Sequence, residues 1–537
     1  MNRPIAHIAW RYLVIPAIAI LWLPSRSKAQ FNKDFQRVSI DDSRLGSVVL
    51  AKVGDNTITA QEFLLSYEYG PAFTKREKDS RKRYLDFMIY EKLLALAGYA
   101  QGGRSRPDVQ NALAEVEADL ATEELYKEDV LKRAHVSDQE INHGVSQERI
   151  HRTVKWIYSR SKEHIMQARH ALEAGASFDS MFARQLSDSL KADERTMETT
   201  MLRVMIRNPL FARVLESLPP KTVSKPVEGP DGWYLVTVVD GWSNAIVTES
   251  ENAKLREDVR RVLVQHKSDS LSDEYVKALM TRRHPVIQRE TFEVLHLYLA
   301  RIVLPAQSFT SWQLADRMKR FMPGYDTTQF DSYQMQPLVM LDRGNYTLAD
   351  FLRWYRPRET AVRLAASSPM SYFHSLENLV WRMVRDRLLT ERAYARKLQK
   401  RERVVKEKKW WEEKLMYQVA KARIVESIPS SDSLLSAYFE KHRASYKIPK
   451  GGGMDSQPIQ DEVWKDYHAD ELTRRMLHEI LQLKQKYGVS VDEQALKELP
   501  VDVDNLPKTI DVYTVKVGGI LPRPAFPTID YDWQAWN

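Results

Sequence analysis

Cysteine is absent from this chain of 537 residues. The chain therefore contains no disulfide, no thiolate nucleophile, no cysteine metal ligand and no cysteine that could carry an N-terminal lipid. Stability has to come from packing, and the 43% of residues that are apolar supply enough material for sizeable cores. At roughly 100–200 residues per domain, we expect two to four globular domains.

Motifs for metals and cofactors are also missing. The thirteen histidines form no metal-binding pair with a glutamate at helical spacing. His164 and His170 stand six residues apart, which places them on different faces of a helix. The glycines at 451–453 lack the lysine–serine pair of a phosphate loop, and the glycine-alanine-serine at 175–177 lacks the closing glycine of a nucleophile elbow. We therefore expect no cofactor and no metal.

Long apolar runs are absent after the first thirty residues. The run over residues 12–23 follows positive charge and is about a dozen residues long, whereas a helix that spans a bilayer needs ~20. Small residues at Ser27 and Ala29 suit cleavage after position 29. We predict a signal peptide over residues 1–29 and an exported chain without a transmembrane segment after cleavage. The alternative is a retained N-terminal anchor.

Charge of one sign does not dominate, because the net charge is only +8. The densest basic cluster, over residues 396–414, is interrupted by four glutamates. Such mixing is typical of the solvated face of a long helix rather than of a nucleic-acid patch. We therefore expect no nucleic-acid partner.

The first half of the chain reads as a helical frame. A polar linker over 30–47 precedes a short strand over 48–53. Thr59 and Glu62 then match a capping box, in which the threonine caps the helix and the glutamate reaches back. Apolar residues at helical spacing predict further helices over 84–99 and 108–132.

The second half repeats this plan. Thr347 and Asp350 form the same kind of cap after a short apolar strand. The closing parts of the two halves also share their apolar spacing, in Leu279, Ile287, Phe292 and Leu295 and in Leu483, Val491, Leu496 and Leu499. We interpret this as a duplication. The alternative is chance similarity between amphipathic helices.

Residues 150–242 lie in the first half only. A predicted strand over 154–158 is followed by helices, one of which ends at Gly175, and then by strands over 223–227 and 233–239. The expected order is β-α-α-α-β-β, which predicts a small α+β domain inserted into one copy of the frame.

Two stretches of this insert carry a family resemblance. The first runs from Ala168 through the glycine-alanine-serine-phenylalanine at 175–178 to Ser187, and the second from Phe211 through the serine-lysine-proline-valine at 224–227 to Gly232. Together they resemble the parvulin family of prolyl isomerases. The surrounding frame resembles SurA and PpiC-type periplasmic folding factors. This resemblance implies a periplasmic location and unfolded polypeptide clients, outer-membrane β-barrel precursors among them.

The resemblance and the repeat together predict a mainly α, multi-domain fold with a small α+β insert. The expected parts are a signal peptide (1–29), a linker (30–47), a SurA-like helical domain (48–149 plus 243–300), a parvulin-like domain (150–242), a connecting segment (301–335), a second helical domain without an insert (336–510) and an aromatic C-terminal tail (511–537). The tail either docks a partner or folds back over the body, and we favour folding back.

The departures from the family concern its two histidines. Trp156 stands where the family carries the histidine of the first strand, and Tyr234, after Trp233, stands where it carries the second. Rotation about an X–Pro bond crosses a barrier of ~18–20 kcal/mol, so a catalyst must bind the twisted amide better than the planar one. Without the histidines, whether this is an enzyme stays open. The parvulin-pocket positions that could bind a peptide, or else belong to the core, are Trp156, Met201, Phe211, Leu218, Trp233 and Tyr234.

Three functional hypotheses follow. The leading one is a periplasmic chaperone whose parvulin-like domain has reduced or no isomerase activity. The second is a working prolyl isomerase with a remodelled site. The third is a structural scaffold of an envelope complex.

Overall fold

The computed structural model describes residues 43–71, 73–74, 79–186, 192–229, 232–245, 248–303, 330–359, 361–362, 364–447, 456–499 and 518–536. The predicted signal peptide lies outside these ranges, as do most of the linker, most of the connecting segment and residues 511–517. The fold is mainly α with small antiparallel sheets, as predicted. In the part of the chain that is described, no helix combines the length and apolarity that a membrane crossing requires.

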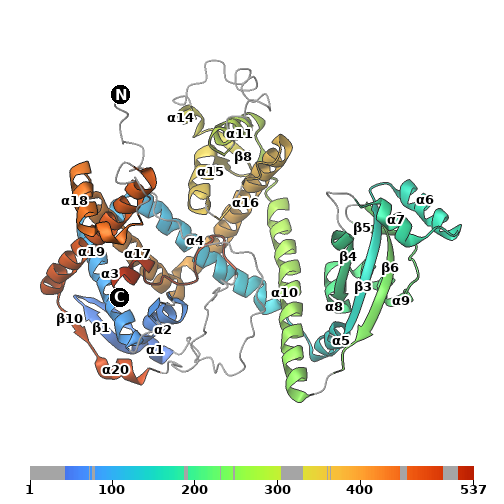
Figure 1. Cartoon of the computed structure of the whole chain (residues 1–537), viewed down its shortest axis with the longest axis horizontal. Helices are drawn as coiled ribbons and strands as arrows, with labels where there is room; N and C mark the ends of the chain where they lie inside the picture. Colours follow the sequence, from blue (N-terminus) through green and yellow to red (C-terminus); the bar gives the residue numbers. More distant parts are fainter. Residues whose placement is uncertain are drawn as a thin grey trace. The chain divides into compact units, whose positions relative to one another are not determined.

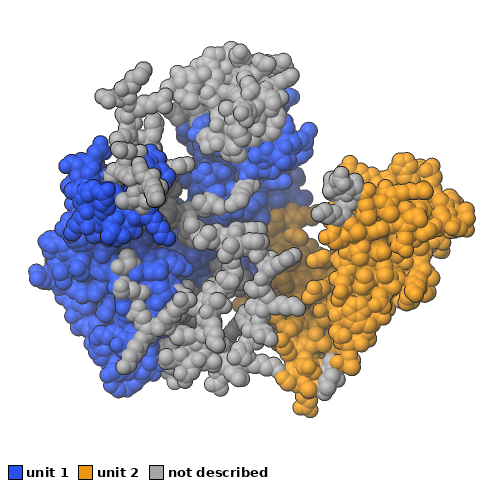
Figure 2. Space-filling view, viewed as in Figure 1, with its two compact units in different colours: residues 1–126, 278–537 blue, residues 127–277 orange. Residues whose placement is uncertain are grey.

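Contacts divide the chain into two compact units (Figure 2). Unit 1 comprises residues 1–126 and 278–537, and unit 2 comprises residues 127–277. Unit 2 thus includes helix α5 (Asp138–Glu148) and most of α10 (Glu249–Thr281), which the predicted domain boundaries assign to the helical frame. Those boundaries stay a prediction.

The first half of unit 1 begins with a hairpin followed by helices. Its elements are α1 (Ser43–Ser47), β1 (Val49–Val53), β2 (Asn56–Thr59), α2 (Ala60–Tyr69), α3 (Ser80–Ala100) and α4 (Pro107–Asp129). Thr59 caps α2 by accepting from the backbone N–H of Glu62 at 3.2 Å. The Glu62 carboxylate does not reach back, however, because it pairs with the buried Lys92 at 3.1 Å. Only half of the predicted capping box forms.

The second half repeats this order. Its elements are β8 (Pro337–Met340), β9 (Asn345–Thr347), α15 (Leu348–Tyr355), α16 (Pro369–Ala395), α17 (Glu402–Glu426), α18 (Asp432–His442), α19 (Gln457–Tyr487), β10 (Val489–Val491) and α20 (Glu493–Glu498). Here the cap is complete, since Thr347 and Asp350 each bond the other's backbone N–H. The same order of hairpin, capped helix and long helices thus occurs twice.

The two halves exchange their closing strands. Strand β10, from the end of the second half, pairs antiparallel with β1 (Figure 1), with Ala51 opposite Val491. Strand β7 (Val286–Ile287), from the end of the first half, pairs with β8, with Ile287 opposite Val339. Each opening hairpin is therefore completed by the other half.

The two largest apolar clusters of unit 1 are assembled across this exchange. The larger core joins α3 to α17, α19 and α20, so that Leu93 and Leu496 belong to one apolar cluster. The other joins α11 (Arg289–Val303) to α15 and α16, with Leu295 and Trp354 fully buried. Neither of these two clusters is complete within one half, whereas a smaller cluster around Phe439 and Val463 lies wholly within the second half.

Helices α3 and α17 cross at close range. The backbone of Gly98 leaves no room for a side chain, because a Cβ there would lie 2.2 Å from the carbonyl oxygen of Met416. Beside this crossing, Lys92 is buried between Glu62 and Glu413, and its ammonium lies 2.8 Å from the second carboxylate. These contacts bind the first half to the second through polar as well as apolar groups.

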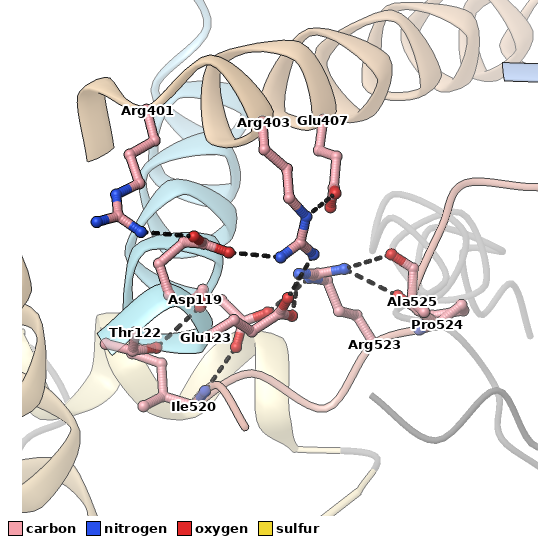
Figure 3. A network of polar contacts seen from close by, with 11 residues as sticks. Asp119, Thr122, Glu123, Arg401, Arg403, Glu407, Ile520, Arg523, Pro524 and Ala525 are labelled. Atoms are coloured by element: carbon pink, nitrogen blue, oxygen red, sulfur yellow. Dashed lines mark hydrogen bonds and ion pairs between the residues drawn. The ribbon is translucent and has the colours of Figure 1, made fainter. Parts of the chain in front are cut away.

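Helix α4 carries a row of buried acids that Figure 3 shows in part. The row comprises Glu115, Asp119, Glu123 and Glu124, and each pairs with arginine from the second half or the tail. The cluster over 396–414 contributes Arg401 and Arg403 to it, while its Glu407, Glu412 and Glu413 are buried. The prediction of a solvated helix face was therefore wrong for this cluster, because its charges neutralise acids on a neighbouring helix.

The described part of the tail, residues 518–536, folds back onto unit 1. Trp533 is fully buried and stacks on Phe87 with ring centroids 5.3 Å apart. Arg523 is buried between Asp119 and Glu123, at 2.6 and 2.8 Å. The tail is thus part of the packed body of this unit.

Acid is expected to loosen the tail through Asp530. Burial by itself raises the pKa of this carboxyl, but Lys421 and Lys414 outweigh it and hold the pKa at about 2, below the ordinary 3.8. A lowered pKa contributes stability that is present above pH 4 and is lost as the pH falls toward 2, here about 2 kcal/mol. Because the chain has no cysteine, a fluorophore on Tyr531→Cys reports this specifically. In an Asp530→Asn background the change of signal over that pH range should be smaller, and what remains belongs to the other carboxylates that hold the tail.

Unit 2 is built on a four-stranded antiparallel sheet in the order β4-β3-β6-β5. The sheet comprises β3 (Ile150–Ser159), β4 (Thr196–Thr200), β5 (Val227–Gly229) and β6 (Gly232–Ser243), and its helices are α6 (Lys162–Glu173), α7 (Phe178–Arg184), α8 (Met201–Arg207) and α9 (Pro209–Ser217). The order differs from the predicted β-α-α-α-β-β by one extra strand, β4, and one extra short helix. Asn208 separates α8 from α9, since its side chain accepts from the N–H of Phe211 and Pro209 follows.

Candidate functional site

The candidate site lies on one face of the sheet of unit 2. Strand residues alternate between faces, so Trp156 and Tyr158 of β3 lie on the same face as Tyr234 and Val236 of β6. The register places Trp156 opposite Val236 and Tyr158 opposite Tyr234. Both positions where the parvulin pattern keeps a histidine therefore lie on this face.

Helices α8 and α9 cover this face. Five of the six predicted site residues gather in its apolar cluster, namely Trp156, Met201, Phe211, Leu218 and Tyr234. Met201 is 1% exposed and is a core residue, whereas the other four are partly exposed at the edge of the cluster. The surface they form is neither a closed core nor fully open to solvent.

Trp233 does not join this group. It packs in the cluster on the opposite face of the sheet, with Ile157, Phe182 and Leu235, and the ammonium of Lys162 lies 4.8 Å from its ring centroid. Adjacent residues of a strand point to opposite faces, so Trp233 and Tyr234 cannot line one surface. The strand alternation of β6 was a sequence signal that could have separated them.

Three aromatic rings meet at the centre of the site. Tyr234 lies edge to face with Phe211, with ring centroids 5.9 Å apart, and it also contacts Tyr158 at 5.1 Å. Tyr158 is not among the predicted site residues, although its position two residues after Trp156 places it on the same face. The hairpin glycines make room for the rings, because a Cβ on Gly229 would lie 2.6 Å from Tyr234 and one on Gly232 would lie 2.7 Å from Tyr158.

A polar group closes one end of this aromatic surface. Gln185 bonds the backbone of Tyr158 through both its amide oxygen, at 3.1 Å, and its amide nitrogen, at 2.9 Å. Arg195 donates to the same amide oxygen at 3.1 Å, and its guanidinium lies 5.2 Å from the centroid of the Tyr158 ring. The arginine thus places a fixed positive charge beside the rings.

Histidine is not part of this surface. On the described strands of the sheet the one histidine is His151, which stacks on Trp242 with ring centroids 5.0 Å apart. Its Nε2 lies 2.9 Å from the amide nitrogen of Asn244. His151 precedes Trp156 by five residues and so points to the opposite face of the strand. The aromatic surface therefore offers apolar contact, a cation and backbone groups, but no imidazole.

Comparison with known proteins gives weak matches. No protein-family signature matches the chain, and no curated protein matches it. Among solved structures, peptidylprolyl isomerase PrsA from Bacillus anthracis is 14% identical with a TM-score of 0.22, and the match covers 36% of this chain and 96% of that one. PrsA from Bacillus cereus is 15% identical with a TM-score of 0.21, covering 42% and 88%. Foldase PrsA from Streptococcus pneumoniae is 14% identical with a TM-score of 0.21, covering 41% and 87%. At this identity and TM-score the matches assign neither a family nor an activity to the chain.

Proposed function

We propose that this protein is a periplasmic folding factor that binds extended segments of unfolded polypeptide on the aromatic surface of unit 2. The observation that carries the proposal is the contact of Phe211, Tyr234 and Tyr158 on one partly exposed sheet face. Exposed aromatic rings bind the apolar side chains and proline rings of many sequences at little cost in conformational entropy. Outer-membrane β-barrel precursors and other exported chains are the proposed clients.

Prolyl isomerisation by this site is proposed to be slight or absent. Trp156 and Tyr234 fill the positions of the two family histidines and point to the same face as Phe211. Phe211 can still contact a proline ring, but no imidazole faces the amide to weaken its resonance. The site therefore favours binding over acceleration of the rotation.

The periplasmic location is proposed from residues 1–29, which have the charge, apolar run and small residues of a cleaved signal. The first residue of the mature chain would be Gln30.

The binding test compares two neighbouring residues of β6. Tyr234→Ala is expected to weaken binding of a labelled, unfolded β-barrel precursor about tenfold, or about 1.4 kcal/mol, because it removes the central ring of the surface. Trp233→Ala is the matched control, since its ring lies on the opposite face, and it should change the affinity less than about twofold. Affinity is read from fluorescence anisotropy. Equal losses in the two variants would contradict the aromatic surface as the binding site.

A proline-limited refolding assay tests the enzymatic part. The rate should stay within about twofold of the uncatalysed rate at stoichiometric protein. A larger acceleration that disappears in Phe211→Ala would instead establish a working isomerase with a remodelled site.

A further inference from the structure

The tail over residues 518–536 lies on unit 1 in the way a bound peptide lies on its receptor. Helices α3, α4 and α17 hold it, and regular structure begins only at the final turn, Tyr531–Trp536. Helix side chains bond its backbone. Asp119 accepts from the N–H groups of Ile520 and Leu521, the second at 2.7 Å, and Glu91 accepts from the N–H of Asp530 at 2.7 Å.

Two charged anchors fix the register of this segment. Arg523 bonds the buried acids Asp119 and Glu123 of α4 (Figure 3), and its guanidinium lies 5.3 Å from the ring centroid of Trp411. Seven residues later, Asp530 pairs with Lys421 of α17 at 2.7 Å. The receptor side is thus acidic at one end and basic at the other.

An aromatic anchor follows at the tenth residue after the arginine. Trp533 enters a pocket of rings formed by Phe87, Tyr90 and Tyr417. Its indole N–H donates to Glu91 at 2.9 Å. A tryptophan held by rings on its faces and a carboxylate at its edge is the type of contact that dominates peptide affinity.

Between the charged anchors the fit is incomplete. Tail residues 526–529 form one wall of a cavity of about 60 Å³, whose other walls include Lys92, Glu413 and Trp410. Room for several water molecules remains there. A segment with larger or polar side chains at these positions would fill the space that the tail leaves.

We propose that this surface of α3, α4 and α17 is a second peptide-binding site, which the chain's own tail occupies until a client displaces it. We name it the tail groove, formed by Phe87, Glu91, Asp119, Glu123 and Lys421. Its ligand is an extended polypeptide with a basic residue, an acidic residue seven positions on and a tryptophan ten positions on. The tail groove belongs to unit 1 and does not depend on the proposed function of the aromatic surface of unit 2.

The test uses the full chain with a weakened tail, Asp530→Ala/Trp536→Ala. These changes remove the ion pair with Lys421 and the ring that packs on Tyr90, and they keep Arg523 and Trp533 in place. The probe is a fluorescein-labelled peptide with the sequence of residues 518–536. We expect the weakened chain to bind it at least tenfold more tightly than the natural chain does, because its own tail competes less. Peptides with Arg523→Ala or Trp533→Ala are the matched controls and should bind at least tenfold less tightly. The difference between the two chains should persist in a Tyr234→Ala background, so that binding to the aromatic surface of unit 2 does not account for it.

A second measurement keeps all of the anchoring residues of the tail and labels one exposed position. A fluorophore on Tyr531→Cys, whose side chain is 69% exposed, should change its emission when excess unlabelled peptide displaces the tail, and a scrambled peptide should leave it unchanged. A folded, weakened chain that binds no peptide would overturn the proposal. If that chain does not fold, an unchanged emission at saturating peptide overturns it, and the tail is then a fixed structural element.

Discussion

Replacing Arg358 with methionine is expected to destabilise unit 1 by about 3–5 kcal/mol, because it removes the fully buried cation that lies between two buried carboxylates. The guanidinium is 1% exposed and lies 2.9 Å from Glu115 and 3.8 Å from Asp386. It also donates to the carbonyl oxygens of Trp354 and Ile520. One side chain thus joins the first half, the second half and the tail. Urea unfolding followed by far-UV circular dichroism measures the loss.

The matched control is Arg387→Met. Arg387 bonds the other oxygen of Glu115 at 3.0 Å, but its side chain is 23% exposed. Water can replace much of that contact, so we expect a loss of only about 1 kcal/mol. A double variant, Arg358→Met/Glu115→Met, should recover part of the lost stability, since it also removes the acid that has lost its buried partner. Equal losses in the two single variants would contradict a special role for the buried arginine.

Trp533→Ala is expected to cost about 3–5 kcal/mol of the stability of unit 1, because it empties a fully buried indole site. Trp533→Phe should lose less, about 1–3 kcal/mol, since it retains a stacking ring but leaves Glu91 without the indole N–H. Tyr531→Ala should stay within about 0.5 kcal/mol, as this residue is 69% exposed and its ring contacts only Phe73 among the described rings. Thermal unfolding of the three variants in parallel gives the ranking. A loss for Tyr531→Ala as large as for Trp533→Ala would show that the tail is held by something other than its buried ring.

The class of each element was largely predictable from local sequence. Apolar spacing and caps such as Thr347 with Asp350 identify a helix from a few neighbouring residues, because the interactions involved are local. Strand β4 was missed, since its threonine-rich stretch at 196–200 lacks alternating apolar residues and is held by pairing with β3. The glutamate of the first capping box was misread for a similar reason. Its partner Lys92 lies thirty residues away in sequence, where no local rule applies.

The pairing between distant strands could not be predicted from the sequence. The repeat predicts two hairpins and two closing strands of the same kind, but it does not say which strand joins which hairpin. Either pairing satisfies the same backbone groups. The exchange seen in β10 with β1 and β7 with β8 depends on the packing of whole helices, such as the approach of Gly98 to Met416. The burial of the acids on α4 could not be predicted either. A row of acidic residues on a helix is expected to face solvent unless its positively charged partners are known.

For the candidate site, the sequence predicted which residues mark the sheet face, but not every residue that lies on it. Trp156, Phe211 and Tyr234 were identified by family resemblance and lie together. Tyr158 was missed, and Trp233 was included although it lies on the opposite face of the sheet. Family resemblance identifies positions in the sequence, whereas strand alternation decides which side chains share a face. The comparison of Tyr234→Ala with Trp233→Ala tests client binding by this face.

The exchanged strands also dictate an order of folding. As the chain is synthesised from its N-terminus, the strand that completes the β1–β2 hairpin, at 489–491, is made more than four hundred residues after it. Until then the edge of β1 is unpaired and the apolar face of α3 lacks α17, so the first half is exposed to aggregation. Unit 2 does not depend on so distant a strand, because all four strands of its sheet lie within residues 150–243. A protein proposed to protect other unfolded chains would thus itself pass through a long unfinished state, with a folding rate limited by contacts more than four hundred residues apart in sequence.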